Sequence, residues 1–279
     1  MNERQNDVLC NVSVQGVATL TLNRVEKHNA FDGVMIAHLL VELERLSADP
    51  SVRVLVLQAN GQHFSAGADL LWMRSMAGQS KEHNYQDASE LARLMQTLDS
   101  FPHPTIALVH GSAFGGALGL ICCCDIAIAT QDARFCLSEV KLGLIPATIG
   151  PYVCRAIGQR QARRYMLSAE TLDAANALRL GLLHQVVGSQ PYALREVLDE
   201  LLHRLLHNGP NALTQAKRLC QQCDNQPITP ELIEHTIALI AQIRVSPEGQ
   251  EGLNAFFSKR APAWVPKDWS AKDTPLGSL

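Results

Sequence analysis

The stretch His110–Asp125, HGSAFGGALGLICCCD, places two adjacent glycines before a run of apolar residues that ends in an acid. Glycine has no Cβ, so another molecule can approach the backbone closely at Gly115 and Gly116. The first N–H groups of a helix lack intrahelical partners and lie at the positive end of the helix dipole. The stretch therefore predicts a helix after Gly116, in which the two glycines either leave the first amides available for chemistry or only permit tight packing of the helix on a strand.

Strand and helix patterns alternate around this stretch. Apolar residues alternate over 11–24 around Gly16, which predicts a hairpin with one buried face. Apolar residues recur at helical spacing over 33–46 and around 91–98. Continuous apolar runs predict three buried strands, at 52–57, 105–111 and 126–130. Repeated units of this kind predict an α/β fold with parallel strands and helices outside the sheet.

Helical patterns dominate after about residue 187. They cover 194–206, 210–220, 230–244 and 251–260. Their apolar faces have no strand to cover, so they must pack on the preceding region or on another subunit, and we expect an oligomer. We predict a core domain at 1–195, a helical domain at 196–265 and an extended tail at 266–279.

Composition excludes several functional classes. The 279 residues are 47% hydrophobic and 18% charged, which is typical of a globular protein. The net charge of −3 and the absence of a Lys/Arg run argue against nucleic acid as a partner. The longest apolar region, 105–130, is interrupted by glycines, His110 and Asp125, so we expect no membrane span. The N-terminal residues do not resemble a leader, and we expect a cytoplasmic protein.

Cysteines and histidines do not form a recognisable metal or nucleotide site in the sequence. The eight cysteines are scattered, so we expect reduced thiols. Cys220 and Cys223 form a C-x-x-C pair without the two further ligands that zinc would need. We read His110 and Asp125 as structural, and we expect no bound metal.

Three stretches together resemble the enoyl-CoA hydratase/isomerase, or crotonase, superfamily. They are GQHFSAGADLLWM at 61–73, the segment 109–146 from VHGSAFGGALGL to KLGLIP, and EGLNAFFSKR at 251–260. The likeness covers nearly the whole chain and begins with LNRVEKHNAFD at 22–32. It implies a spiral of ββα turns followed by a helical domain that forms trimers, commonly paired as hexamers.

The resemblance also implies a chemistry and three catalytic positions. The shared step of the superfamily is stabilisation of an acyl-CoA thioester enolate, in which negative charge develops on the carbonyl oxygen. Ala68 and Gly116 match the positions whose backbone N–H groups form the oxyanion hole. Glu139 matches a catalytic glutamate, although it could also be a surface acid paired with Lys141. No separate cofactor is implied, because coenzyme A is part of the substrate.

Further positions match regions that bind coenzyme A or the acyl group. Lys27 belongs to a region that lines the CoA entrance, and Phe257 and Lys259 could close it from a neighbouring subunit. The other implied substrate-binding residues lie around the same motifs and are Ala30, Ala66, Asp69, Leu70, Gly115 and Gly119.

The sequence departs from the two-glutamate hydratases at one position. Their second acid lies three residues beyond the oxyanion glycine, where this chain has Gly119. Hydration and Δ3,Δ2-isomerisation both remain open with one glutamate, and so does a non-catalytic scaffold that binds CoA or RNA. The segment FCLSEVKLGLIPATIGPYV, together with Gly119, is similar to methylglutaconyl-CoA hydratases of leucine breakdown and carboxygeranoyl-CoA hydratases. We therefore expect hydration of a branched, carboxylated acyl group.

Overall fold

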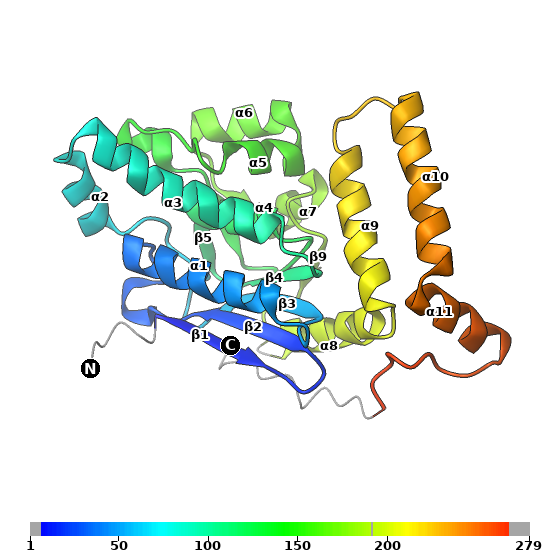
Figure 1. Ribbon diagram of the computed structural model, residues 1–279. Coiled ribbons are helices and arrows are strands. Elements are labelled where there is room, and N and C mark those ends of the chain that lie inside the picture. The colour runs from blue at the N-terminus through cyan, green and yellow to red at the C-terminus, as the bar shows by residue number, and fades with distance from the viewer. Residues whose placement is uncertain (1–6, 191, 268–279) are drawn as a thin grey trace.

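The computed structural model describes residues 7–190 and 192–267. Within these residues a six-stranded sheet has the order β1-β2-β3-β4-β6-β9, and a three-stranded sheet has the order β5-β7-β8 (Figure 1). The larger sheet is parallel except for its first pair, β1 with β2. The strands are β1 (Val8–Val12), β2 (Val17–Leu22), β3 (Val54–Ala59), β4 (Thr105–Val109), β5 (Ser112–Phe114), β6 (Ile126–Thr130), β7 (Arg134–Cys136), β8 (Leu172–Asp173) and β9 (Gln185–Val187).

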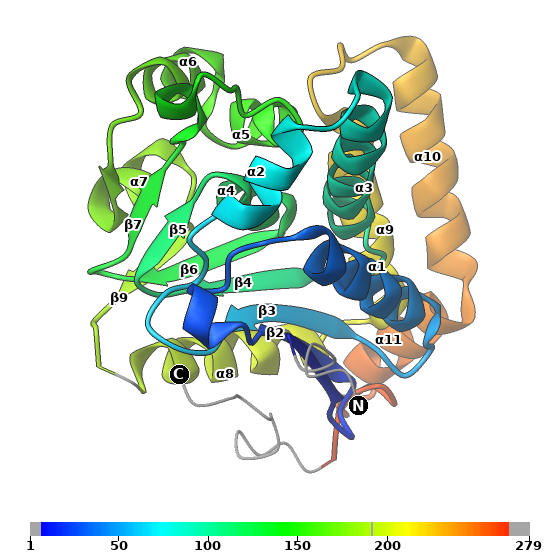
Figure 2. The same ribbon diagram turned by 90° about the vertical axis from the view of Figure 1, so that its left-hand side faces the viewer.

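Helices cover both faces of the larger sheet, as Figure 2 shows. The helices before residue 190 are η2 (Val25–Lys27), α1 (Gly33–Ala48), α2 (Leu70–Ala77), α3 (Lys81–Asp99), α4 (Gly116–Cys123), η3 (Glu139–Leu142), α5 (Gly150–Ile157), α6 (Gln159–Ser168) and α7 (Ala174–Leu180). The remaining helices are α8 (Ala193–Leu206), α9 (Pro210–Cys223), α10 (Pro230–Val245) and α11 (Pro247–Phe257). The alternation of strands and helices confirms the α/β prediction.

Strand β2 corrects the predicted hairpin. The antiparallel pair exists, but all six residues of β2 are buried, so both faces of this strand lie in the core. Leu20 packs with α1 on one face, whereas Val17 joins the four leucines of α8 on the other. The prediction of one buried face holds for β1, whose residues alternate between buried and more exposed positions. It is wrong for β2, because β2 is an interior strand.

Helix α8 belongs with the sheet as well as with the C-terminal helices. Its buried Leu194, Leu198, Leu202 and Leu206 lie against the apolar residues of β3, β4 and β6. The predicted domain boundary after residue 195 therefore falls inside a helix that packs on the core. The predicted tail at 266–279 lies outside the described residues except for its first two positions.

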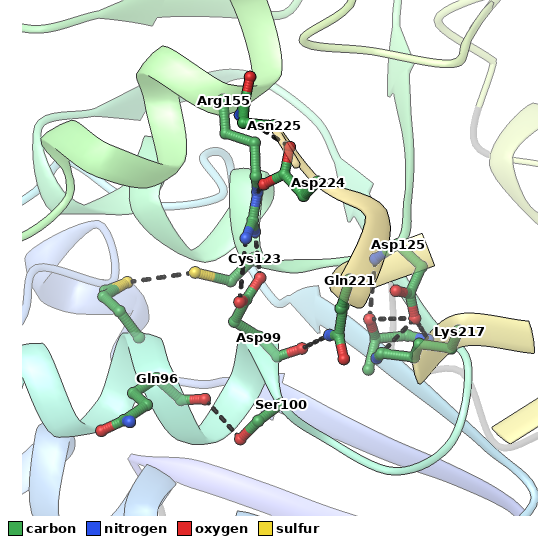
Figure 3. A network of polar contacts seen from close by, with 12 residues as sticks. Gln96, Asp99, Ser100, Cys123, Asp125, Arg155, Lys217, Gln221, Asp224 and Asn225 are labelled. Atoms are coloured by element: carbon green, nitrogen blue, oxygen red, sulfur yellow. Dashed lines mark hydrogen bonds and ion pairs between the residues drawn. The ribbon is translucent and has the colours of Figure 1, made fainter. Parts of the chain in front are cut away.

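Helix α9 is joined to the core by polar contacts, which Figure 3 shows from close by. The ammonium of Lys217 lies 2.8 Å from Oδ2 of Asp125, and the amide of Gln221 donates to the carbonyl of Asp99 at 2.7 Å. Asp125 also accepts from the backbone N–H of Thr105 at 2.8 Å, which confirms that it is structural. The side chain of Asp99 in turn pairs with Arg155 of α5.

The described helices include none that combines the length and apolar character needed to cross a bilayer. All eight cysteines are free thiols.

Candidate active site

A cavity of about 290 Å³ lies between α2, α3, the start of α4, and the segment from η3 to Ile149. Its walls are mainly apolar, with Trp72, Met73 and Met76 on one side and Leu144 to Ile149 on the other. Its lining includes Ala68, Gly116 and Glu139, the three predicted catalytic positions. The structure thus brings together residues that are as far as 71 positions apart in the sequence.

The turn before α4 requires glycine. Gly115 has φ +53° and ψ −125°, a conformation that residues with a side chain rarely adopt. A Cβ at this position would lie 3.3 Å from Oε1 of Glu139. The N–H of Gly115 donates to the carbonyl of Cys136 at 2.9 Å, and α4 begins at Gly116. The glycine pair therefore places a helix N-terminus beside the glutamate.

The loop that carries Ala68 is pressed against this turn. Gly67 has φ +91°, and a Cβ there would lie 2.9 Å from the carbonyl oxygen of Phe114. Ser65 and Ala113 form a parallel bridge, in which the N–H of Phe114 donates to the carbonyl of Ser65 at 3.0 Å. This close contact of two backbones explains why glycines flank both predicted oxyanion positions.

Phe31 connects the two halves of the predicted oxyanion hole. Its N–H donates to the carbonyl of Gly67, and its carbonyl accepts from the N–H of Asp69, each at 2.7 Å. Its ring lies 3.5 Å from the position that a Cβ of Gly116 would occupy. In the described part of the chain, the amides of Ala68 and Gly116 have no protein acceptor, so both are available to a substrate oxygen.

A buried ion triad supports the same loop. The guanidinium of Arg24 lies 3.2 Å from Asp32 and 3.1 Å from Asp69, and all three side chains are less than a tenth exposed. Asp32 caps α1 and Asp69 caps α2 by accepting backbone N–H groups. The two backbone hydrogen bonds of Phe31 lie between these caps, so Arg24 links the helix starts that flank the oxyanion loop.

Glu139 lies at the start of η3, where the chain leaves β7 for the cavity wall. Its Oε2 is buried without a hydrogen-bond partner within the described residues. Burial raises the pKa of the carboxyl group above its ordinary value. Glu139 lines the cavity with a buried Oε2, and it forms no ion pair with Lys141 within the described residues, so the surface interpretation does not hold. A poorly solvated carboxyl beside two free amides suits proton transfer to a bound thioester.

Gly119 requires a correction. The sequence interpretation placed it beside the acyl group, but it does not line the cavity. A Cβ there would lie 2.3 Å from Cγ2 of Ile149 and 2.9 Å from the sulfur of Met95. The volume that the missing second acid leaves is therefore filled by Ile149 and Met95, and it is not open to substrate.

The other predicted binding residues lie outside the cavity lining. Asp69 is committed to Arg24 and to the amides of α2, so the structure gives it a supporting role. Lys27, Ala66 and Leu70 are exposed near the oxyanion loop, whereas Ala30 is buried. Phe257 and Lys259 are exposed at α11, far from α2 within one chain (Figure 1). Contacts from these two residues to a site would require another subunit.

The sequence analysis did not predict the part of the cavity wall that α2 and α3 form. Trp72 and Met76 lie on α2, a helix that the sequence analysis did not predict, and Asn84 and Asp87 lie on α3. None of the residues of α2 is buried: Leu70 and Leu71 are exposed, and the later apolar side chains of the helix line the cavity. The available signal was the motif LLWM with Met76 one turn later.

Comparisons with known proteins agree with this geometry. The family model for enoyl-CoA hydratase/isomerase matches residues 13–267. A crystal structure of an enoyl-CoA hydratase from Shewanella pealeana is 52% identical, with a TM-score of 0.90 over 94% of this chain and 97% of that chain. Pseudomonas aeruginosa AtuE is 35% identical, with a TM-score of 0.88 over 93% of this chain and 100% of the other.

Comparison with a curated relative from Escherichia coli gives the same family. It is the 2,3-dehydroadipyl-CoA hydratase, which is 32% identical over 252 residues, covering 89% of this chain and 94% of the relative. The cavity of this chain brings together two free amides and a half-buried carboxyl group. The chain is an enzyme of the enoyl-CoA hydratase/isomerase family, within the crotonase superfamily.

Proposed function

We propose that the protein hydrates 2-enoyl-CoA thioesters with Glu139 as its single acid-base residue. The observation that carries this proposal is the buried, unpartnered oxygen of Glu139 in the cavity that the oxyanion-loop residues Ala68 and Gly116 also line. The amides of Ala68 and Gly116 would bind the thioester oxygen and stabilise the negative charge that develops on it.

The reaction adds the elements of water in two proton transfers. Glu139 accepts a proton from water as the water oxygen bonds to C3, and the C2=C3 electrons move to the thioester oxygen as an enolate. The enolate then collapses and takes the proton from Glu139 at C2. The net change is addition of H to C2 and OH to C3, and the glutamate returns to its starting state. The raised pKa of Glu139 supports this double role, because the group must both accept and return a proton.

A second candidate is Δ3,Δ2-enoyl-CoA isomerisation. It is favoured by the filled space at Gly119, since Ile149 and Met95 leave no room there for a second acid to hold water. The same glutamate would then move a proton between C2 and C4. Assays of the purified protein with crotonyl-CoA and with a 3-enoyl-CoA ester separate the two reactions. Hydration of crotonyl-CoA that is lost in Glu139→Gln supports the first, and turnover of the 3-enoyl ester alone would replace it with the second.

For the acyl group we propose a carboxylated chain, with 3-methylglutaconyl-CoA of leucine breakdown as the first candidate. The support is the resemblance of the segment around Glu139 and the Escherichia coli relative, whose name gives a dicarboxylic acyl-CoA as its substrate. Gly119 itself gives no support to this choice, because Ile149 and Met95 fill the space beside it. A panel of carboxylated and uncarboxylated esters tests this choice.

We further propose that the chain assembles as a trimer or a hexamer of two trimers. Helices α9 and α10 have no buried residue in a single chain, although both carry apolar side chains. Such faces are typical of subunit contacts.

A further inference from the structure

Hydrogen bonds join the loop that carries Ala68 to strand β5. The N–H of Ser65 donates to the carbonyl of Ser112, and the carbonyl of Ser65 accepts from the N–H of Phe114, each at 3.0 Å. Ala68 follows Ser65 by three positions, and Gly116 follows Phe114 by two. These contacts therefore set the position of the two oxyanion amides relative to one another.

One further bond between this loop and β5 has a titratable atom as its acceptor. The backbone N–H of Ser112 donates to Nδ1 of His63 at 3.1 Å. A backbone N–H can only donate, so Nδ1 accepts through its lone pair and the ring of His63 is neutral. A proton on Nδ1 would face the N–H of Ser112 and would remove this hydrogen bond. The contact between the loop and β5 is therefore complete only while His63 is neutral.

The ring of His63 is packed against the backbone that leads into β5. Gly111 has φ +59°, and a Cβ there would lie 2.8 Å from Nδ1 of His63 and 2.2 Å from the carbonyl oxygen of Gln62. The carbonyl of His63 accepts from the side-chain amide of the buried Asn29 at 2.9 Å. His63 is thus held at its backbone and at its ring, so a change at Nδ1 acts directly on the start of β5.

The charged groups that face His63 are two other histidines. The ring of His28, at the end of η2, lies edge to face with the ring of His63, with centroids 5.2 Å apart. His110, after β4, donates from Nε2 to the carbonyl of Gly61 at 2.8 Å, and its Nδ1 is buried without a partner in the described part of the chain. Burial lowers the pKa of His63, and His28 and His110 lower it further. These surroundings favour the neutral ring.

We propose that His63 is a positioning residue whose neutral ring aligns the oxyanion hole, so that protonation of Nδ1 in mild acid displaces Ala68 from Gly116 and reversibly weakens enolate stabilisation. The inference rests on the proposed function, which gives these two amides their role. A displacement of about 1 Å at a catalytic group can cost about 10²-fold in rate. Loss of one contact beside the hole can therefore lower activity while the fold persists.

The dependence on pH has a defined direction. The pKa of His63 lies below its ordinary value of 6.5, so the ring gains its proton only below about pH 6. Glu139 must be ionised to accept a proton, so acid lowers turnover through this residue as well. A decisive measurement therefore has to report on the oxyanion hole itself and not only on the rate.

The carbonyl stretch of a bound thioester reports on the oxyanion hole, because hydrogen bonds to a carbonyl oxygen lower its stretching frequency. Butyryl-CoA has no double bond to hydrate, and infrared difference spectra with and without ¹³C at its carbonyl isolate this stretch. In the wild-type protein the stretch should lie below that of free butyryl-CoA at about pH 7.5 and should return toward it below about pH 6. Circular dichroism should show an intact fold over this range, and a return to neutral pH should restore the shift.

Two substitutions at His63 separate the proton from the contact. His63→Asn provides an amide oxygen that can accept from the N–H of Ser112 but cannot titrate, so the infrared shift should persist in acid. His63→Leu removes the acceptor, so it should reduce the shift at every pH and lower kcat by about tenfold or more at neutral pH.

The matched control is His28→Asn. It removes a neighbouring histidine without removing a bond between the loop and β5, and asparagine tolerates the φ of +50° at this position. This variant should keep the loss of the shift in acid. The midpoint of that loss should lie at higher pH than in the wild type, because His28 lowers the pKa of His63.

The outcomes separate this inference from the proposed function. Glu139 titrates in the wild type and in every variant, so its effect cancels in the comparison. The role of His63 is wrong if the shift disappears at the same pH in His63→Asn as in the wild type, or if it persists in the wild type down to the pH of unfolding. A normal shift in His63→Leu at neutral pH would overturn it as well. Absence of any shift in the wild type at neutral pH would instead contradict the oxyanion hole and, with it, the proposed function.

Discussion

Glu139 combines its proposed catalytic role with a cost to the stability of the fold. Burial raises its folded-state pKa above the unfolded value, so any stability linked to its proton is complete below the unfolded pKa. That stability is lost as the pH rises through the folded-state pKa. Relative to acidic pH, the carboxyl group therefore costs stability once the pH exceeds its folded-state pKa.

Substitution of this residue should reveal that cost. Glu139→Gln cannot titrate, so its Tm relative to the wild type should increase as the pH rises from about 4 to about 8. Thermal unfolding at several pH values measures the difference. A difference that is independent of pH, or one that decreases toward pH 8, would show that the group is well solvated.

The packing around position 119 favours glycine over any residue with a side chain. Alanine normally stabilises a helix interior by about 1 kcal/mol relative to glycine. Here the added Cβ would meet Ile149 at 2.3 Å, and overpacking costs about 1–3 kcal/mol, so Gly119→Ala should be destabilising. Ile149→Ala should remove most of that penalty. A double-mutant cycle by chemical denaturation measures the coupling, and additive effects would mean that the two positions do not compete for space.

At the scale of elements, Arg24 connects the N-termini of α1 and α2. Arg24→Met would remove the buried cation beside Asp32 and Asp69 and should lower the free energy of unfolding by about 3–5 kcal/mol. The matched control is Arg164→Met, because Arg164 pairs with Glu170 on the surface, where an ion pair contributes about 0–1 kcal/mol. Equal losses in the two variants would contradict the role given to the buried triad.

The sequence predicted the elements whose signal is local. The strands at 105–109 and 126–130 and the helix start at Gly116 were visible because apolar runs and glycines mark them directly. Helix α2 was missed because none of its residues is buried, so its sequence lacks the stripe of core-facing apolar residues that marks a helix. The prediction for β2 was correct for the strand and wrong for its burial. Alternation of apolar residues cannot reveal that α8, more than 170 residues later, covers the second face of this strand.

The catalytic positions were predicted from motif order, whereas their surroundings were not. Ala68, Gly116 and Glu139 line one cavity as expected. The contacts that fill the space at Gly119 of α4 come from Met95 of α3 and from Ile149, which directly precedes α5. Contacts of this kind depend on how helices cross, which residue spacing alone does not determine.

At the scale of the whole molecule, α10 leaves an apolar stripe exposed. Ile233, Ile237 and Ile240 are 48%, 53% and 53% exposed and follow one another at helical spacing. A trimer would bury such a stripe, so Ile237→Glu should shift the protein toward monomers in sedimentation velocity. Glu234→Gln, on the same helix, is the control and should leave the assembly unchanged. A wild-type protein that sediments as a monomer would contradict the proposed assembly.

The central claim joins all three scales: two backbone amides stabilise an enolate while Glu139 moves the proton. Exchange of the C2 protons of butyryl-CoA with D2O tests this step without water addition, and it can be followed by mass spectrometry. The wild-type protein should incorporate deuterium at C2, and Glu139→Gln should be slower by about 10²–10⁴-fold while it keeps its fold. Exchange that proceeds at the wild-type rate in Glu139→Gln would show that another group moves the proton.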